Sequence, residues 1–148
     1  IMIVERWGGD LYHISIVYVA NTLTAFILMN IMASKIQLSN ITKFKIGIGC
    51  TTFVFIGLSF VTEWWMAMPF MSLVGATWAF LFIGGNFHLM ENNPRSTSTG
   101  IFSSTLSIST VIGPIIAGSI AFMFDYIAVM YFAIAIIVSA FIVSLKVK

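Results

Sequence analysis

Residues 96–124 read STSTGIFSSTLSISTVIGPIIAGSIAFMF, a run of 29 residues without a single Asp, Glu, Lys or Arg. A helix needs about 20 predominantly apolar residues to cross the hydrocarbon core of a bilayer, so this run is long enough to span one. The whole chain of 148 residues is 59% apolar and only 8% charged, whereas an ordinary soluble domain is about 25% charged. This composition excludes a soluble globular domain and a disordered chain. The single cysteine, Cys50, excludes a disulfide-rich secreted module.

Four more charge-free runs occupy most of the remaining sequence. They cover residues 11–34, 46–62, 64–90 and 126–145, and they are 24, 17, 27 and 20 residues long. Backbone groups in lipid need internal partners, so such spans are helices or strands of a closed barrel, and the ten-residue alternation of a barrel is absent. We therefore predict an all-α membrane helix bundle, one segment over residues 1–148. Its five transmembrane helices are predicted at residues 11–34, 44–62, 64–90, 97–124 and 126–145.

The basic residues gather on one side of the predicted bundle. Six Lys and Arg fall on the side formed by residues 35–45, 91–95 and 146–148. One, Arg6, falls on the side formed by residues 1–10, Glu63 and Asp125. Basic residues mark the cytoplasmic face, so we expect an external N-terminus and a cytoplasmic C-terminus in a plasma membrane. Tryptophan favours membrane interfaces, and three fall at the outer one: Trp7, Trp64 and Trp65.

The first residues suggest a longer protein. The chain opens with Ile1 and shows no signal peptide, although its N-terminus is predicted outside. We therefore expect this chain to be the C-terminal piece of a longer one, with residues 1–4 ending a preceding helix. The net charge of +2 reflects the one-sided basic residues and indicates no nucleic-acid partner.

Polar content separates the five predicted helices. Those at 11–34, 64–90 and 97–124 carry polar side chains and are expected to face a cavity, whereas those at 44–62 and 126–145 are expected to face lipid. In the fourth helix a polar stripe covers about 80° of the circumference and comprises Ser96, Thr99, Ser103, Ser107, Thr110 and Pro114. We favour a polar cavity wall for the stripe as a whole.

Two further features of the fourth predicted helix affect this interpretation. Proline removes a backbone hydrogen bond and kinks a helix, so the pair Gly113-Pro114 predicts a break there. The alternative to a cavity wall is helix packing, in which the hydroxyl groups join helices and Gly113, Ala117 and Gly118 permit close approach.

Residues 92–142 contain a second pattern: Arg95, then Gly100, then Gly113-Pro114 with Gly118, then the turn Phe124-Asp125-Tyr126. This segment resembles the last two helices of a major facilitator superfamily secondary transporter. The resemblance implies that the five helices are the eighth to twelfth of twelve, and that they move a small solute such as a drug or sugar by alternating access. Residues 32–45, MASKIQLSNITKFK, lack the Gly and Asp of that family's gating motif, so that role is not carried over.

The candidate substrate contacts are midplane positions on the three polar helices. They are Asn21, Thr24, Trp78, Phe82, Ser103, Ser107 and Thr110. Asn21 and Thr24 lie about 60° apart, and the Asn21 amide is expected to bond either a substrate or a neighbouring helix. Trp78 is unusual at mid-span, and it shares a face with Met71 and Phe82 that forms either a substrate wall or core packing.

Other chemistry is not expected from this chain. No charged residue lies deep in a predicted span, so a proton-coupled transporter would carry its coupling acid in another segment. His13 and His88 fall near span ends, where hydrated interfacial histidines are expected. Without a P-loop, a metal-ligand cluster or a Ser-His-Asp set, we expect no enzyme, cofactor or metal.

The expected partners are the lipid bilayer, a small-molecule substrate and preceding helices of the same chain, with no nucleic acid. The alternative function is a membrane scaffold or assembly subunit that binds protein partners through small-residue helix faces.

Overall fold

The structure is a computed structural model that describes Val4, residues 7–91 and residues 93–146. The chain is 88% helical, without a strand in the described part, which confirms the predicted all-α bundle. Its elements are α2 (Leu11–Ser34), α3 (Asn40–Ser59), the short helix η1 (Trp64–Met66), α4 (Ala67–Glu91), α5 (Arg95–Met123) and α6 (Tyr126–Lys146). Five of these helices are long and apolar enough to cross a membrane. The predictions for residues 1–3, Arg6 and Lys148 lie outside the described residues.

Polar side chains fix where the first two helices begin. Asp10 caps α2: its side chain accepts a hydrogen bond of 3.0 Å from the backbone N–H of His13, whose Nδ1 accepts one of 3.2 Å from the Asp10 N–H. Ser39 caps α3, and its Oγ accepts from the backbone N–H of Thr42 at 3.2 Å. Such caps satisfy amide groups that lack helical partners. Because of the Ser39 cap, α3 begins at Asn40, earlier than the predicted residue 44.

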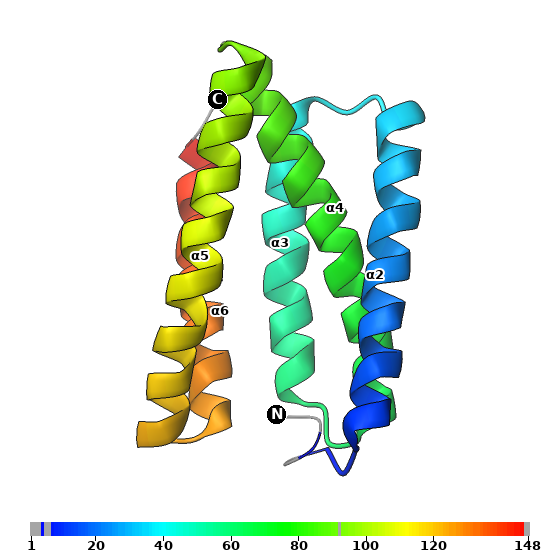
Figure 1. Ribbon diagram of the computed structural model, residues 1–148, viewed down its shortest axis with the longest axis vertical. Coiled ribbons are helices and arrows are strands. Elements are labelled where there is room, and N and C mark those ends of the chain that lie inside the picture. Colours follow the sequence, from blue (N-terminus) through cyan, green and yellow to red (C-terminus); the bar gives the residue numbers. More distant parts are fainter. Residues whose placement is uncertain (1–3, 5–6, 92, 147–148) are drawn as a thin grey trace.

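Helix α4 crosses between α2 and α3 and packs closely against both (Figure 1). Glycines permit this approach. A Cβ on Gly75 would overlap the backbone of Asn21 in α2, and one on Gly84 would lie 2.8 Å from the Asn40 carbonyl oxygen in α3. Van der Waals packing through such small residues is what holds helices together in lipid.

The glycines of α5 do not pack in this way. Within the described part, nothing lies within 4 Å of a Cβ built on Gly100, Gly113 or Gly118. The alternative interpretation of Gly113 and Gly118 is that they permit close packing of helices. In the described part of the chain, no helix packs against either glycine. Helix α5 also continues without interruption through Pro114, so the expected break does not divide it.

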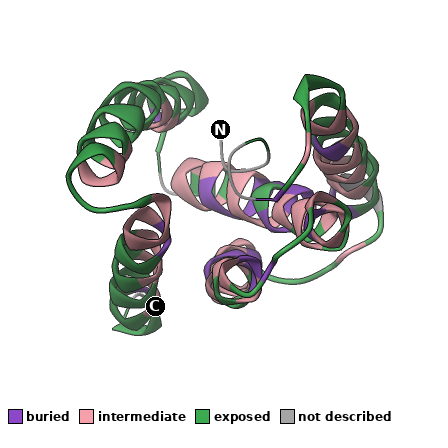
Figure 2. Ribbon diagram, turned by 90° about the horizontal axis from the view of Figure 1, so that it is seen from below, coloured by how far each residue is buried: buried purple, intermediate pink, exposed green. Residues whose placement is uncertain are grey.

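Buried positions gather on the central helices, whereas α5 is exposed almost throughout (Figure 2). Helix α3, expected to face lipid, packs against α4 and α6, and only part of its surface is open. The larger core cluster lies at the lower end of Figure 1 and comprises Trp7, Val17, Val54, Leu58, Val61, Ala67 and Met130. A second cluster comprises Met32, Ala79 and Ile83.

The expected interfacial tryptophans lie in three different environments. Trp7 is only 5% exposed, and its carbonyl oxygen accepts a 3.0 Å hydrogen bond from the Trp64 N–H. Trp64 is half-buried, with its ring 3.9 Å from that of His13. Trp65 is 58% exposed. Trp7 thus packs in the larger core cluster at one end of the bundle, and the interfacial position of the three tryptophans stays a prediction.

The two ends of the bundle differ in charge. One end, at the top of Figure 1, joins the C-termini of α2 and α4 to the N-termini of α3 and α5. The basic residues described there are Lys35, Lys43, Lys45, Arg95 and Lys146. The opposite end holds three acids, Asp10, Glu63 and Asp125. We call these the basic end and the acidic end.

Candidate functional site

An open groove of about 490 Å³ lies between α2 and α4 near the middle of both helices. Helix α2 contributes a stripe at helical spacing: Tyr18, Asn21, Thr22, Ala25, Phe26 and Met29. Helix α4 contributes Val74 and Trp78. We call this the α2–α4 groove. Its lining is aromatic and apolar with one amide and two kinds of hydroxyl, and it includes no charged side chain.

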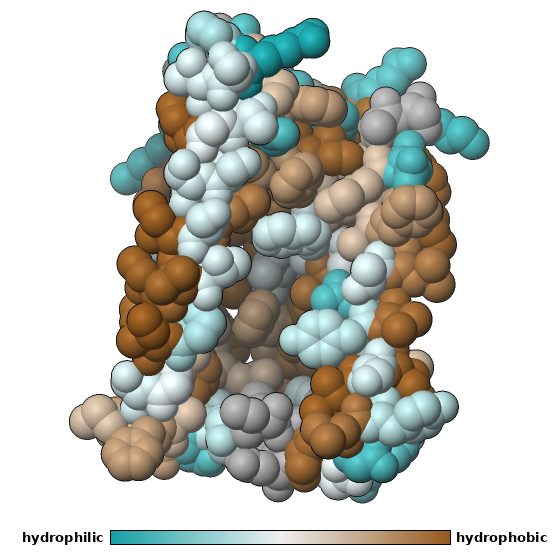
Figure 3. Space-filling model, viewed as in Figure 1, coloured by the Kyte–Doolittle hydropathy of each residue, from teal (hydrophilic) through white to brown (hydrophobic). Residues whose placement is uncertain are grey.

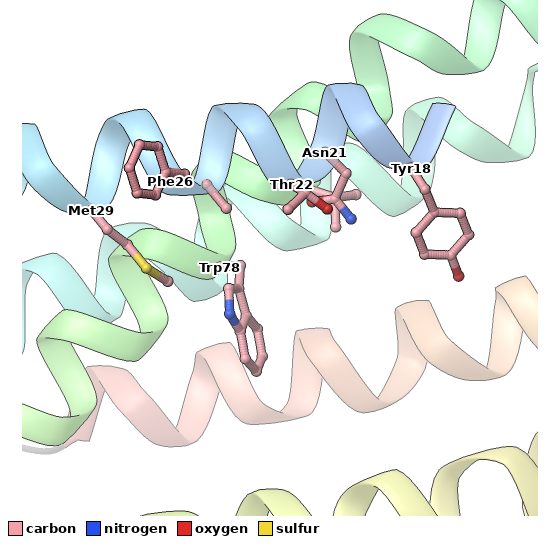
Figure 4. A pocket seen from close by; sticks show the side chains of 8 residues that line it. Tyr18, Asn21, Thr22, Phe26, Met29 and Trp78 are labelled. Atoms are coloured by element: carbon pink, nitrogen blue, oxygen red, sulfur yellow. The ribbon is translucent and has the colours of Figure 1, made fainter. Parts of the chain in front are cut away.

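The structure brings two predicted contacts, Asn21 and Trp78, together in this groove. In Figure 4 the Tyr18, Asn21 and Trp78 side chains extend from their helices toward the same space. No described group forms a hydrogen bond with the Asn21 amide, so its N–H groups are available to a ligand, whereas its Oδ1 lies close to Gly75 of α4. Trp78 is 42% exposed, which leaves much of its ring surface free for contact.

Thr24, predicted beside Asn21, has a different role. Its Oγ1 donates a 2.8 Å hydrogen bond to the carbonyl oxygen of Ala20, within its own helix, and it does not line the groove. The neighbouring Thr22 lines the groove instead. The difference arises because Thr24 lies about 60° from Asn21 on the side of the helix opposite to the other groove residues.

An aromatic row connects the groove to α5. The ring centroids of Trp78 and Phe82 lie 6.2 Å apart, and those of Phe82 and Phe102 lie 5.4 Å apart at an angle of 78°. Edge-to-face pairs of this kind add to the stability gained from burial. Phe82 therefore adjoins Trp78, as predicted, but it also joins α4 to α5. Met71 packs against the core at the acidic end instead.

The predicted hydroxyl stripe of α5 lies apart from the groove. Ser103, Ser107 and Thr110 are all exposed, and Thr110 Oγ1 donates to the Ser107 carbonyl oxygen at 2.8 Å. None of the three lines the α2–α4 groove. Figure 3 shows pale, weakly polar atoms along α5 beside a hollow that separates it from α2. The assignment of this stripe to a cavity wall remains a prediction.

Five groove residues on α2 are not among the predicted contacts: Tyr18, Thr22, Ala25, Phe26 and Met29. Their spacing of one, three and four residues around Asn21 is a signal that could have found them. On α2 the prediction rests on Asn21 and Thr24 alone, so it leaves out the aromatic and apolar members of the stripe.

Both histidines pair with a carboxylate near a helix end. His13 Nδ1 lies 2.8 Å from Asp10 Oδ1, and His88 Nδ1 lies 2.9 Å from Glu91 Oε2. The backbone N–H of His13 lowers the pKa of Asp10, which precedes α2, below its ordinary value, because the bond favours the ionised carboxylate.

Comparison with known proteins gives no relative. No protein-family model, no curated protein and no solved structure matches the chain. The class of protein is therefore given by the fold alone. The described residues form five helices of membrane-spanning length, which is compatible with a multi-pass membrane protein.

Proposed function

We propose that this chain is the C-terminal part of a secondary active transporter of the major facilitator type, which moves a small solute by alternating access. In this proposal the helices cross the plasma membrane with the basic end in the cytoplasm. Support comes from the sequence resemblance around Arg95, Gly100, Gly113-Pro114 and Gly118, and from the opposite charge of the two bundle ends.

The α2–α4 groove is the observation that carries the proposal. Small-molecule sites are concave, mostly apolar and contain a few polar groups that orient the ligand, and the groove combines an unpaired Asn21 amide with the rings of Tyr18, Phe26 and Trp78. Because the lining carries no charge, it suits an uncharged or weakly polar solute such as a sugar or a drug. Sites of such transporters lie near the bilayer midplane, and this groove lies near the middle of α2 and α4.

The open face of α5 supports the same proposal. Ser103, Ser107 and Thr110 are exposed on α5, and Figure 3 shows weakly polar residues along α5 beside a hollow. Polar groups are costly against lipid and are usually placed toward a cavity or another helix. Further helices of the same protein would complete a solute pathway there.

The test is transport by the natural protein that contains this chain, reconstituted in liposomes with an imposed ion gradient. Uptake of a panel of uncharged sugars and amphipathic aromatic compounds is measured. Trp78→Leu and Asn21→Leu should each reduce uptake of the transported compound at least about tenfold, since each removes a ligand contact. Trp65→Leu is the matched control, because Trp65 is exposed at the acidic end, and it should transport normally.

The alternative, a membrane scaffold, is favoured by one observation. In the described part nothing lies within 4 Å of a Cβ built on Gly100, Gly113 or Gly118 of α5, so another protein's helix could approach α5 closely at these positions. A scaffold predicts no gradient-driven uptake of any compound and equal behaviour of the Trp78 and Trp65 variants. It also predicts that Gly113→Leu disrupts assembly with a partner while the α2–α4 groove variants do not.

A further inference from the structure

A second pocket, of about 440 Å³, lies toward the basic end between four helices. Its lining includes Phe44 of α3, Gly85 and His88 of α4, Phe102 and Thr105 of α5, and Ser144 of α6. We call this the four-helix pocket. It shares no lining residue with the α2–α4 groove, so it is a separate cavity.

The hydroxyl groups of the four-helix pocket have already used their hydrogens. Thr105 Oγ1 donates to the Ile101 carbonyl oxygen at 2.9 Å, and Ser144 Oγ donates to the Phe141 carbonyl oxygen at 2.7 Å. A hydroxyl oxygen that donates still holds lone pairs. Ser144 is buried, at 4% exposure, so of the two hydroxyl groups only that of Thr105 is exposed, and toward a ligand it can only accept a hydrogen bond.

His88 adds a second acceptor. Its Nδ1 lies 2.9 Å from Glu91 Oε2, and the other carboxylate oxygen accepts from Asn40 Nδ2 at 2.8 Å. An ionised carboxylate only accepts, so the proton of the neutral imidazole is on Nδ1 and Nε2 carries a lone pair. No described group pairs with Nε2. Asn40 and Glu91 thus fix the tautomer that makes His88 an acceptor.

We propose that the four-helix pocket binds an uncharged single-chain amphiphile with a hydroxyl head group, such as a long-chain alcohol or a monoacylglycerol. The hydroxyl donates to His88 Nε2, and the chain lies against Phe44 and Phe102. The described lining includes no Asp, Glu, Lys or Arg, so a charged head group of either sign would be unpaired there, and burial of an unpaired charge is costly. His88 lies near the C-terminal end of α4. This proposal does not depend on the transport function.

The test uses the full chain in detergent micelles and a photoactivatable diazirine analogue of hexadecanol. Labelled peptides are mapped, and unlabelled hexadecanol competes against its methyl ether, which keeps the chain but cannot donate. In the wild-type protein the alcohol should compete about tenfold better than the ether, as one hydrogen bond allows. In His88→Leu the two competitors should become equal, because the acceptor is gone.

Filling variants give an independent measurement. Thr105→Phe should abolish labelling of the pocket peptides, because the exposed Thr105 lines the pocket and a ring there fills it. Ser104→Phe is the matched control: Ser104 is also exposed on α5 but does not line the pocket, so labelling should persist. If Thr105→Phe fails to fold, Ile101→Trp serves in its place, because Ile101 also lines the pocket and is 55% exposed.

Three results would overturn the proposal. The first is equal competition by the alcohol and the ether in the wild-type protein. The second is an alcohol preference that survives in His88→Leu, and the third is equal labelling of the Thr105→Phe and Ser104→Phe variants. The His88→Leu comparison is a ratio within one protein, so it remains decisive even if both filling variants misfold.

Discussion

Gly75 of α4 lies against the backbone of Asn21 of α2, and no space for a Cβ remains between them. A Cβ built on Gly75 would overlap the Asn21 carbonyl oxygen and lie 2.9 Å from its Oδ1. Asn21 is also the residue that offers an unpaired amide to the α2–α4 groove. The crossing of α2 and α4 and the candidate binding group are therefore at the same place. A substitution that forces the two helices apart also displaces the Asn21 amide.

The first prediction concerns this crossing. Gly75→Ala should destabilise the protein by about 1–3 kcal/mol, because overpacking forces the backbones of α2 and α4 apart. The melting temperature in detergent, followed by tryptophan fluorescence, measures the effect. Gly118→Ala is the control, since nothing lies within 4 Å of Gly118 in the described part. It should leave stability unchanged or raise it, because alanine favours helix more than glycine. Equal losses in the two variants would contradict the packing role of Gly75.

The second prediction concerns the α5 stripe. Single cysteines at Ser103, Ser107 and Thr110 in a Cys50→Ser background should react with a charged, membrane-impermeant thiol reagent in liposomes. Cysteines at Ile108 and Ile115, exposed apolar positions on another side of α5, serve as controls. The stripe should react at least about tenfold faster, since the reactive thiolate forms only where water reaches it. Equal rates would place the stripe in lipid and remove the cavity assignment.

The third prediction concerns the cap of α2. The pKa of Asp10 is lowered by the backbone N–H of His13, so the ionised carboxylate is favoured in the folded state. A lowered carboxyl pKa stabilises the fold above its unfolded pKa, and this stability is lost as the pH falls through the folded pKa. The melting temperature should therefore fall in acid by less in Asp10→Asn than in the wild-type protein. Glu63→Gln, at the same end of the bundle, should keep the wild-type pH dependence.

The fourth prediction concerns Pro114. Helix α5 continues through this residue although proline supplies no N–H for a bond to the Thr110 carbonyl oxygen. Pro114→Ala should restore that bond and slow amide hydrogen exchange in residues 112–118, while exchange in α6 stays unchanged. Unchanged exchange in α5 would show that the missing bond leaves α5 no less stable there.

The helices could be predicted because a helix that crosses the hydrocarbon core needs about 20 predominantly apolar residues, and each charge-free run is about that long or longer. The predicted start of α3 at residue 44 is too late, because the basic residues before it indicate a loop, whereas the Ser39 cap lets the helix begin at Asn40. Lys43 is part of α3 and is only 7% exposed, because the aliphatic part of its side chain can be buried near the basic end. Ser39, followed by Asn40-Ile41-Thr42, is a typical N-cap and indicates a helix that begins at Asn40. A prediction based on charge-free runs alone does not use this signal.

The candidate site could be predicted only in part. Asn21 and Trp78 were identifiable as polar or aromatic residues at mid-span, and both line the groove. Their meeting depends on Gly75, and sequence alone does not distinguish a glycine that meets another helix from one that does not. The glycines singled out, Gly113 and Gly118, are open, whereas Gly75 and Gly84 form the crossings. The environment of a helical glycine is set by tertiary packing, which a single sequence does not record.

The pairing of α5 with α6 has a mechanical consequence. Helix α5 contacts α4 in its N-terminal half, where Ser98 bonds to the Leu89 carbonyl oxygen and Phe102 packs on Phe82, and α6 packs against α3. Helix α4, in contrast, is interlocked with α2 and α3 along its length. Under a pulling force applied at Lys146, α6 and α5 should be extracted first as one hairpin at low force. The later and larger rupture should occur when α4 is pulled from between its two neighbours.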